Sequence, residues 1–204
     1  MAPGLSGPPR ERWRHPLLRH QIEGFLIGPA GLACCAFLER RNEDWYDALA
    51  CRTDLLDPDS GALRARLEDR LPLGCVDEVL WCSDAALRGL WGHALHSGDL
   101  VAHDPRPCGG SLGNTRALAC SLGLLLWDLG QTDSLRVRPL DPAGHGFAPL
   151  PGLPVGQVAA VSARGPRLAV ALFHPGHLLV YEHDAHSAVP RLLWQHACSG
   201  DETP

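Results

Sequence analysis

The sequence predicts an α+β fold with a mainly antiparallel sheet and with its helices concentrated in the N-terminal half. Three observations lead to this prediction. Helical patterns dominate the first half, short apolar runs typical of strands dominate after Thr115, and the two do not alternate as they do in a βαβ fold. A chain of 204 residues is long enough to bury a real core. We expect a flexible tail at 1–10, one domain at 11–198 and a second tail at 199–204.

The first fifty residues are expected to form a helix, a hairpin and a turn. Apolar residues at helical spacing follow Glu11, although Pro16 must stand in a first turn or break the segment. The run 25–39 holds two apolar stretches split by Gly-Pro-Ala-Gly, which predicts a strand, a turn and a second strand. Residues 42–50, which are rich in aromatic side chains, indicate a turn or a short helix.

Two helices are predicted between residues 57 and 98. The segment 57–71 begins with Asp and Ser residues that can cap a helix, and its acidic residues come early. The segment 83–98 has the clearest helical pattern, with Ser83 as the N-cap and Gly98 as the stop. Its apolar stripe consists of Leu87, Leu90, Trp91 and Leu95. Strands are expected at 76–82 and 99–104.

The second half of the chain is expected to supply most of the sheet. Short apolar runs separated by Gly, Pro and Asp turns predict strands within 116–129, 134–140, 157–163, 167–173, 177–184 and 191–195. The Pro-rich segment 139–156 is expected to be one extended surface connection. The sequence shows no internal repeat.

Composition narrows the classes of partner and compartment. The net charge of −5 argues against general nucleic-acid binding. Arginines at 10, 12, 14 and 19 fit either a solvated helix face or an arm that contacts phosphates. All 18 basic residues are arginine, which fits a GC-rich genome or selection against ubiquitin acceptors. We find no signal-peptide pattern and no apolar run of membrane-spanning length. A reducing compartment, cytosolic or nuclear, is therefore expected for the eight cysteines.

Four histidines, His174, His177, His183 and His186, raise the question of a metal site. Pro175-Gly176 suits a type II turn, so we expect a β-hairpin with His174 beside His177. His177 and His183 are six residues apart on one strand, which separates them by about 20 Å. The four therefore cannot share one ion, and no metal site is predicted. A zinc-dependent alternative would use His174, His177 and either His196 or Cys198.

No catalytic or cofactor-binding residues are predicted. The chain has no C-x-x-C pair and no lysine with which to build a P-loop at 108–114. His93 and His96 are three residues apart on the expected helix, but the pattern lacks the glutamate of an H-E-x-x-H motif. Cys34-Cys35 lies in an apolar run and is expected to be structural. The chain is expected not to be an enzyme.

A pattern of turn glycines and core positions over roughly residues 20–195 resembles the SUKH superfamily. Within that superfamily it is most similar to the betaherpesvirus tegument and early regulatory proteins. The residues that carry the resemblance are Cys34-Cys35, Trp45, Gly98, the "LGNT" at 112–115, Trp127-Asp128 and the "GHLLVYE" at 176–182. The chain is shorter than many viral members, which carry two modules, and it has room for one.

The resemblance implies a recognition domain without enzymatic activity. Viral members of the family bind host defence proteins and block cell death or antiviral signalling. The implied partner is therefore a host protein, and the implied location is the host cytoplasm or nucleus. Bacterial members neutralise toxins as immunity proteins, and that alternative also remains open. The resemblance names neither the partner nor the oligomeric state.

Overall fold

A computed structural model describes residues 21–27, 33–39, 50–84, 86–108, 115–128, 135–140, 146–173, 176–183 and 190–197. Up to residue 50 it describes the backbone only. The described residues contain strands and turns but no helix, so the fold is all-β and the predicted α+β class is wrong. The expected tails at 1–10 and 199–204 lie outside the described residues.

The strands form four antiparallel sheets of four strands each, and the sheets follow one another along the chain. The first sheet contains β1 (Gln21–Ile27), β2 (Ala33–Glu39), β3 (Ala50–Leu56) and β4 (Leu63–Glu68). The second contains β5 (Leu71–Val76), β6 (Val79–Ser83), β7 (Leu90–Ala94) and β8 (Leu100–Asp104). The third contains β9 (Thr115–Cys120), β10 (Gly123–Asp128), β11 (Arg136–Arg138) and β12 (Ala148–Pro149). The fourth contains β13 (Val158–Arg164), β14 (Arg167–Leu172), β15 (His177–Glu182) and β16 (Arg191–Ala197).

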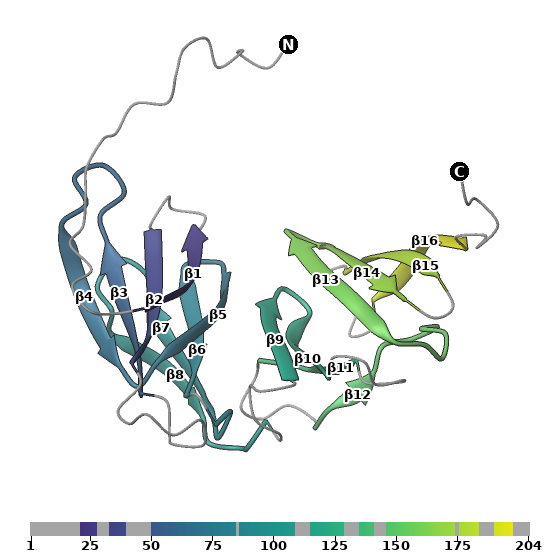
Figure 1. Cartoon of the computed structure of the whole chain (residues 1–204), viewed down its shortest axis with the longest axis horizontal. Helices are drawn as coiled ribbons and strands as arrows, with labels where there is room; N and C mark the ends of the chain where they lie inside the picture. The colour runs from purple at the N-terminus through teal and green to yellow at the C-terminus, as the bar shows by residue number, and fades with distance from the viewer. Residues whose placement is uncertain are drawn as a thin grey trace, which may run out of the picture.

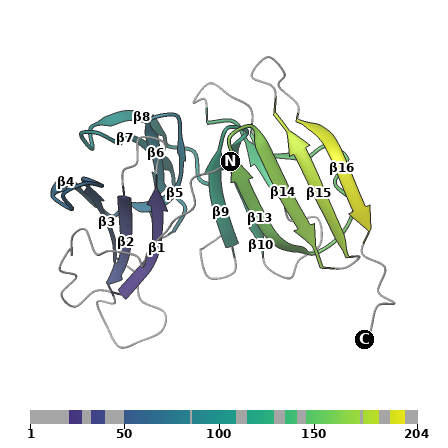
Figure 2. The same ribbon diagram turned by 90° about the horizontal axis from the view of Figure 1, so that it is seen from above.

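The four sheets stand in an open arc, with the first and fourth sheets at its two ends (Figures 1 and 2). The first strand of each sheet contacts the first strand of the next, so β1 contacts β5, β5 contacts β9 and β9 contacts β13. The fourth strand of each sheet is an edge strand. Sheets of four strands repeated about a common centre are the architecture of β-propellers. The described part of this chain is therefore a propeller-like array of four blades.

Each pair of neighbouring sheets shares its own apolar core. Leu55 and Leu67 of the first sheet pack with Leu80 of the second. Trp81 of the second sheet packs with the third sheet in the next core. The core between the third and fourth sheets is the largest, and its buried residues include Trp127, Val170, Leu179 and Tyr181. Stability is therefore distributed along the array in sheet-to-sheet steps, as in other repeat proteins.

The predicted helix at 83–98 is wrong, because this segment forms a loop followed by β7. Ser83 does not cap a helix: its hydroxyl donates to the carbonyl of Gly89 across the loop, at 2.8 Å. Leu87 has φ 55 and is fully buried in a turn, so it is not part of a helical stripe. Gly98 does end the segment with φ 80, but it closes the turn that follows β7, and its N–H donates to the carbonyl of Ala94.

The predicted helix at 57–71 is wrong for a similar reason. Asp57 accepts hydrogen bonds from the backbone N–H groups of Asp59 and Ser60, which closes a turn between β3 and β4. The following residues, "LRARLE", then alternate polar and apolar side chains as a strand does. Leu67, which points into the core, is 7 % exposed, whereas the arginines beside it face outward.

Most of the predicted strands are confirmed. The hairpin expected at 25–39 appears as β1 and β2, and the strand expected at 99–104 appears as β8. The late hairpin that ends in "LLVYE" appears as β14 paired with β15. The connection expected at 139–156 contains β12 at its middle, and the strand expected at 76–82 is interrupted by a turn at Asp77 before β6. The short helix or turn expected at 42–50 lies almost wholly outside the described residues.

Candidate binding surface on the second sheet

The edge strand of the second sheet exposes two large aliphatic side chains in succession. Leu100 and Val101 are each 56 % exposed. The pairing of β7 with β8 shifts between Gly92 and His93, so that Val101 is an extra residue in the ladder. A bulge of this kind breaks the alternation of a strand and re-aims its side chains. The bulge is the local reason why two neighbouring apolar residues both reach solvent.

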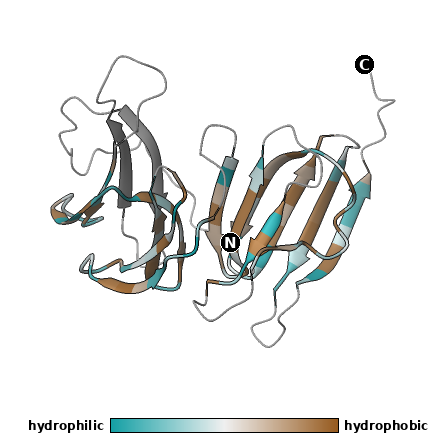
Figure 3. Ribbon diagram, turned by 90° about the horizontal axis from the view of Figure 1, so that it is seen from below, coloured by the Kyte–Doolittle hydropathy of each residue, from teal (hydrophilic) through white to brown (hydrophobic). Residues whose placement is uncertain are grey.

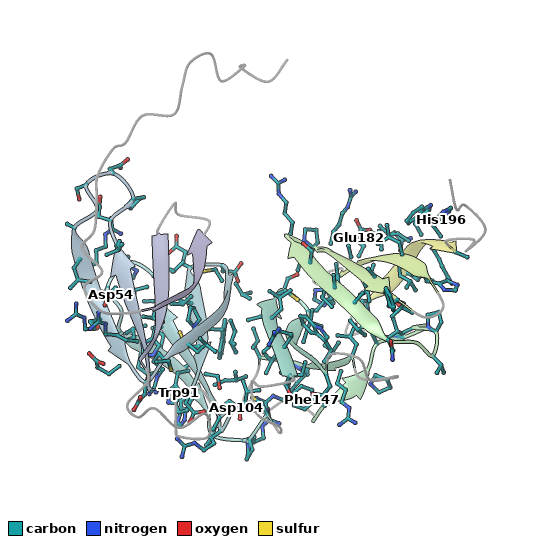
Figure 4. All side chains as sticks on the ribbon, in the orientation of Figure 1. Asp54, Trp91, Asp104, Phe147, Glu182 and His196 are labelled. Atoms are coloured by element: carbon teal, nitrogen blue, oxygen red, sulfur yellow. The ribbon has the colours of Figure 1, made fainter. Side chains whose placement is uncertain are left out.

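Beside these aliphatic residues, three side chains are stacked on one another. The rings of Trp91 and His103 are 5.2 Å apart between centroids and within 19° of parallel. On Trp91, the Cζ atom of Arg70 lies 3.9 Å from the ring centroid, which is a close cation–π distance. Because Trp91 pairs with His103 and His93 pairs with Leu100, the register places Leu100 on the same face as the stack. We call Arg70, Trp91, Leu100, Val101 and His103 the β8 surface, of which Trp91 is labelled in Figure 4.

Arg70 reaches Trp91 because the chain turns sharply just before it. Asp69 has φ 53, and one guanidinium nitrogen of Arg70 donates to the Asp69 carbonyl at 3.0 Å. This turn joins β4 of the first sheet to β5 of the second. The guanidinium is therefore held over the ring by the connection between the two sheets. A planar cation fixed on an indole face presents a large contact area with little side-chain entropy left to lose.

His93 is the cross-strand neighbour of Leu100 on this face and is only 7 % exposed. Its Nδ1 is 2.9 Å from the carbonyl oxygen of Gly98, and because that oxygen can only accept, Nδ1 carries the proton. The other ring nitrogen, Nε2, is buried without a hydrogen-bond partner. A proton added at Nε2 would therefore place a charge where nothing accepts it. Burial lowers the pKa of His93 below its ordinary value of 6.5, and the charge of Arg70 adds to this effect.

We expect the protein to lose stability as the pH falls below about 6.5, in part through His93. The unfolded chain takes up a proton on this imidazole near its ordinary pKa, whereas the folded ring, whose pKa is lowered, stays neutral. The stability that His93 contributes is thus fully present above the pKa of the unfolded chain. It is lost as the pH falls through the lowered pKa of the folded protein. The measurement is the free energy of urea unfolding between pH 7.5 and pH 5. His93→Gln should flatten the pH dependence, and an unchanged slope in this variant would contradict the prediction.

The far end of β8 is fixed by a buried ionic network at the junction with the third sheet. Asp104 is 1 % exposed, and the guanidinium of Arg106 donates to both of its carboxylate oxygens, the shortest distance being 2.7 Å. Arg138 of β11, 2 % exposed, lies 3.7 Å from the same carboxylate. Hydrogen bonds from Arg106, together with the charge of Arg138, lower the pKa of Asp104. Ion pairs at Asp104 therefore fix the C-terminal end of β8, the strand that carries most of the β8 surface.

The structure separates the histidines that an alternative zinc site would need. His177 pairs with Ala197, and Leu178 pairs with His196, so the register puts His177 and His196 on opposite faces of the fourth sheet. His174, His186 and Cys198 lie outside the described residues. Among the residues that the structure describes, no three His, Cys, Asp or Glu side chains are grouped so as to hold a metal ion.

The other candidate residues also fall into structural positions. His93 and His96, expected on one helix face, instead lie in β7 and in the turn after it. Cys34 and Cys35 are consecutive residues of β2, of which only the backbone is described. Of the segment 108–114, only Cys108 is described, and it is buried beside Arg138. Trp45 and most of "LGNT" lie outside the described residues.

None of the sites predicted from the sequence includes the β8 surface. Trp91 was assigned to a helical stripe, and Arg70 to the end of another helix. Period-two alternation in "LRARLE" and the short spacing of the turns on either side of β7 were the signals that could have shown strands there. With β7 and β8 recognised as a hairpin, Trp91 and His103 become cross-strand neighbours.

Comparisons with known proteins identify no family for this chain. No family model and no curated protein matches it. Among solved structures, it is similar to BamB from Moraxella catarrhalis, with 13% identity and a TM-score of 0.38 over 90% of this chain. The match spans 63% of the BamB chain. In the described part of the protein, no helix has the length and hydropathy that a membrane span requires.

Proposed function

We propose that this protein is a binding protein without enzymatic activity, which holds a protein partner at the β8 surface. The observation that carries the proposal is the juxtaposition of exposed Leu100 and Val101 with the stack of Arg70, Trp91 and His103. Tryptophan and arginine are the residues most enriched among those that dominate the affinity of protein interfaces. Exposed aliphatic side chains around such a pair exclude water from it when a partner docks.

The identity of the partner remains a prediction from the sequence. A host defence protein was expected from the resemblance to the viral regulatory family, with a toxin as the bacterial alternative. The all-β fold removes the α+β architecture on which that resemblance depended, so we base the binding role on the β8 surface instead. The negative net charge of the chain supports a protein partner over nucleic acid. The intracellular location and the absence of a cofactor remain predictions as well.

A photo-crosslinking amino acid at position 100 should capture the partner in cells. We expect a specific adduct at position 100, and we expect Trp91→Ala to reduce it strongly, because loss of a central tryptophan at an interface weakens binding by about 30-fold or more. Mass spectrometry would identify the captured protein.

Position 155 provides the matched control, because Val155 is 66 % exposed and lies outside the β8 surface. The same probe at position 155 should yield no corresponding adduct. Equal capture at both positions, or an adduct at position 100 that survives Trp91→Ala, would contradict the proposed function. Thermal unfolding of each variant would confirm that the protein remains folded.

A further inference from the structure

The outer face of the fourth sheet, which turns away from the third sheet, has an unusual composition. The pairing registers of β13 to β16 arrange its residues in three rows that cross all four strands. From β13 to β16, the first row is Ala160, Ala171, Leu178 and His196. The second row is Ser162, Ala169, Val180 and Trp194, and the third is Arg164, Arg167, Glu182 and Arg191. We call these twelve residues the outer face.

Six of the eight residues in the first two rows of the outer face are Ala, Leu, Val or Trp, although these rows are open to solvent. Leu178 is 38 % exposed and Trp194 is 48 % exposed, and the alanines of these rows are exposed or half-buried. The opposite face of β13, β14 and β15 is buried against the third sheet, whereas β16 is exposed along its whole length. An antiparallel sheet that is covered on one side only normally alternates apolar and polar residues. Here apolar side chains stand on both faces of β14 and β15, and Figure 3 shows hydrophobic stretches interspersed with hydrophilic ones on the strands of this sheet.

Large and small side chains divide the outer face into two halves. In the first two rows, β13 and β14 contribute only Ala160, Ser162, Ala169 and Ala171, whereas β15 and β16 contribute Leu178, Val180, Trp194 and His196. The rings of Trp194 and His196 stack within 5° of parallel, with centroids 5.7 Å apart, so the large half has a raised, ordered edge. Sheets pack well when large residues on one face meet small residues on the other.

We propose that a second copy of this chain covers the outer face, related to the first by a two-fold axis parallel to the strands. Such an axis reverses the order of the strands in the facing copy. Trp194 then lies over the partner's Ser162, and Leu178 lies over the partner's Ala171, so each large half fills the other copy's small half. A symmetric contact of this kind buries the same surface on both subunits, as two-fold dimers do.

The charged row makes contacts of both signs under the same axis. Within one chain, the carboxylate of Glu182 is 3.1 Å from Arg191 and 4.0 Å from Arg167. The two-fold places Glu182 of each copy over the partner's Arg167, which produces two attractive pairs near the centre of the row, and it places Arg164 over the partner's Arg191, which produces two like-charged pairs at the exposed ends of the row. A two-fold axis perpendicular to the strands would instead place large residues over large ones, such as Trp194 over the partner's Trp194. It would also place the charged third row over the partner's first row.

The contact area sets the expected strength of this dimer. Four strands about 4.8 Å apart and three rows about 6.7 Å apart cover about 400 Å² on each copy, or about 800 Å² in total, which is less than the roughly 1,000 Å² that a stable specific interface buries. We therefore expect a reversible dimer that forms at high protein concentration rather than an obligate one. This dimer uses the fourth sheet and leaves the β8 surface of the second sheet open, so the two proposals can fail separately.

Sedimentation equilibrium of the purified full chain tests the proposal. We expect dimers to become detectable by about 100 µM, which corresponds to weak association. Ala171→Arg, which places a bulky charge on the small half, should abolish them. Val155→Arg, at an exposed position outside both surfaces, should leave association unchanged. A chain that stays monomeric at this concentration would overturn the proposal, as would association that persists in Ala171→Arg with an unchanged unfolding midpoint.

Charge reversal at the facing pair tests the direction of the axis. Arg167→Glu and Glu182→Arg should each weaken self-association, because each creates two like-charged contacts across the two-fold. An equimolar mixture of the two variants should restore dimers, since residue 167 of one variant then faces an opposite charge at residue 182 of the other. A structural defect inside each chain would persist in the mixture. Failure of the mixture to associate more than either variant alone would reject this arrangement.

Discussion

Replacing Arg138 with alanine is expected to lower the free energy of unfolding by about 3–5 kcal/mol, because it removes one member of a buried ionic network. The guanidinium is 2 % exposed, and it donates to the carbonyl of Arg106 at 3.2 Å and to Cys108 Sγ at 3.3 Å. It also lies 5.1 Å from the ring centroid of Phe147. Its loss leaves these acceptors without their donor and opens a cavity between the second and third sheets.

Urea unfolding provides the measurement, and Arg88→Ala provides the matched control. Arg88 also pairs with an aspartate, Asp84, at 2.7 Å, but its side chain is 77 % exposed. Exposed pairs of this kind contribute about 0–1 kcal/mol. A second readout is the reactivity of Cys108, which is 6 % exposed and should become accessible to thiol reagents in Arg138→Ala. If the two arginine variants unfold at the same urea concentration, the network does not stabilise the junction.

How far the sequence predicts this fold depends on which pattern dominates each segment. The late strands were predictable because apolar runs such as "RLAVALF" are short, rich in Val and Leu, and bounded by Gly or Pro turns. The sheet to which each strand belongs was not predictable, because strand pairing is set by turns of variable length. The repetition of four sheets is visible only in the strand order, since the four segments share no motif in the sequence.

The segment 83–98 shows why helix and strand patterns were confused. Leu87, Leu90, Trp91 and Leu95 fall at helical spacing by coincidence, because a buried loop residue precedes a short strand. Only Leu90 and Trp91 of these four belong to β7. Asp84 organises the loop by accepting hydrogen bonds from the backbone of Ala86 and Arg88. A side chain that satisfies loop amides in this way has the same sequence signature as a helix cap.

The candidate sites depend on contacts that are distant in sequence. Arg70 and Trp91 are brought together by a sheet connection, and Asp104 and Arg138 come from different sheets. Neither pair has a local signature, so sequence patterns could not have found them. The four-histidine segment, by contrast, has a strong local signature, and its interpretation as a hairpin rather than a metal motif agrees with the pairing of β14 and β15.

Gly74→Ala is expected to be among the most damaging single substitutions in the chain. It forces apart β5 and β9, the strands through which the second and third sheets contact each other. A Cβ atom at Gly74 would lie 2.1 Å from the carbonyl oxygen of Ala119 and 3.0 Å from its carbonyl carbon. Both are backbone atoms of β9, so no side-chain rotation can relieve the contact. We expect a loss of about 3 kcal/mol or more in the free energy of unfolding, at the upper end of the cost of overpacking a core.

The cost at Gly74 should come from close packing alone, and two other glycines allow this to be tested. Gly146 has no heavy atom within 4 Å of an added Cβ, so Gly146→Ala should change stability by less than about 0.5 kcal/mol. Gly123 combines a contact of 2.1 Å to the Arg138 carbonyl with φ 128, so its alanine variant should be at least as damaging as that of Gly74. In urea unfolding, Gly146→Ala should therefore be much more stable than the alanine variants of Gly74 and Gly123. Near-native stability of Gly74→Ala would mean that β5 and β9 are not held at this distance, and the shared core of the second and third sheets would then be looser than their packing implies.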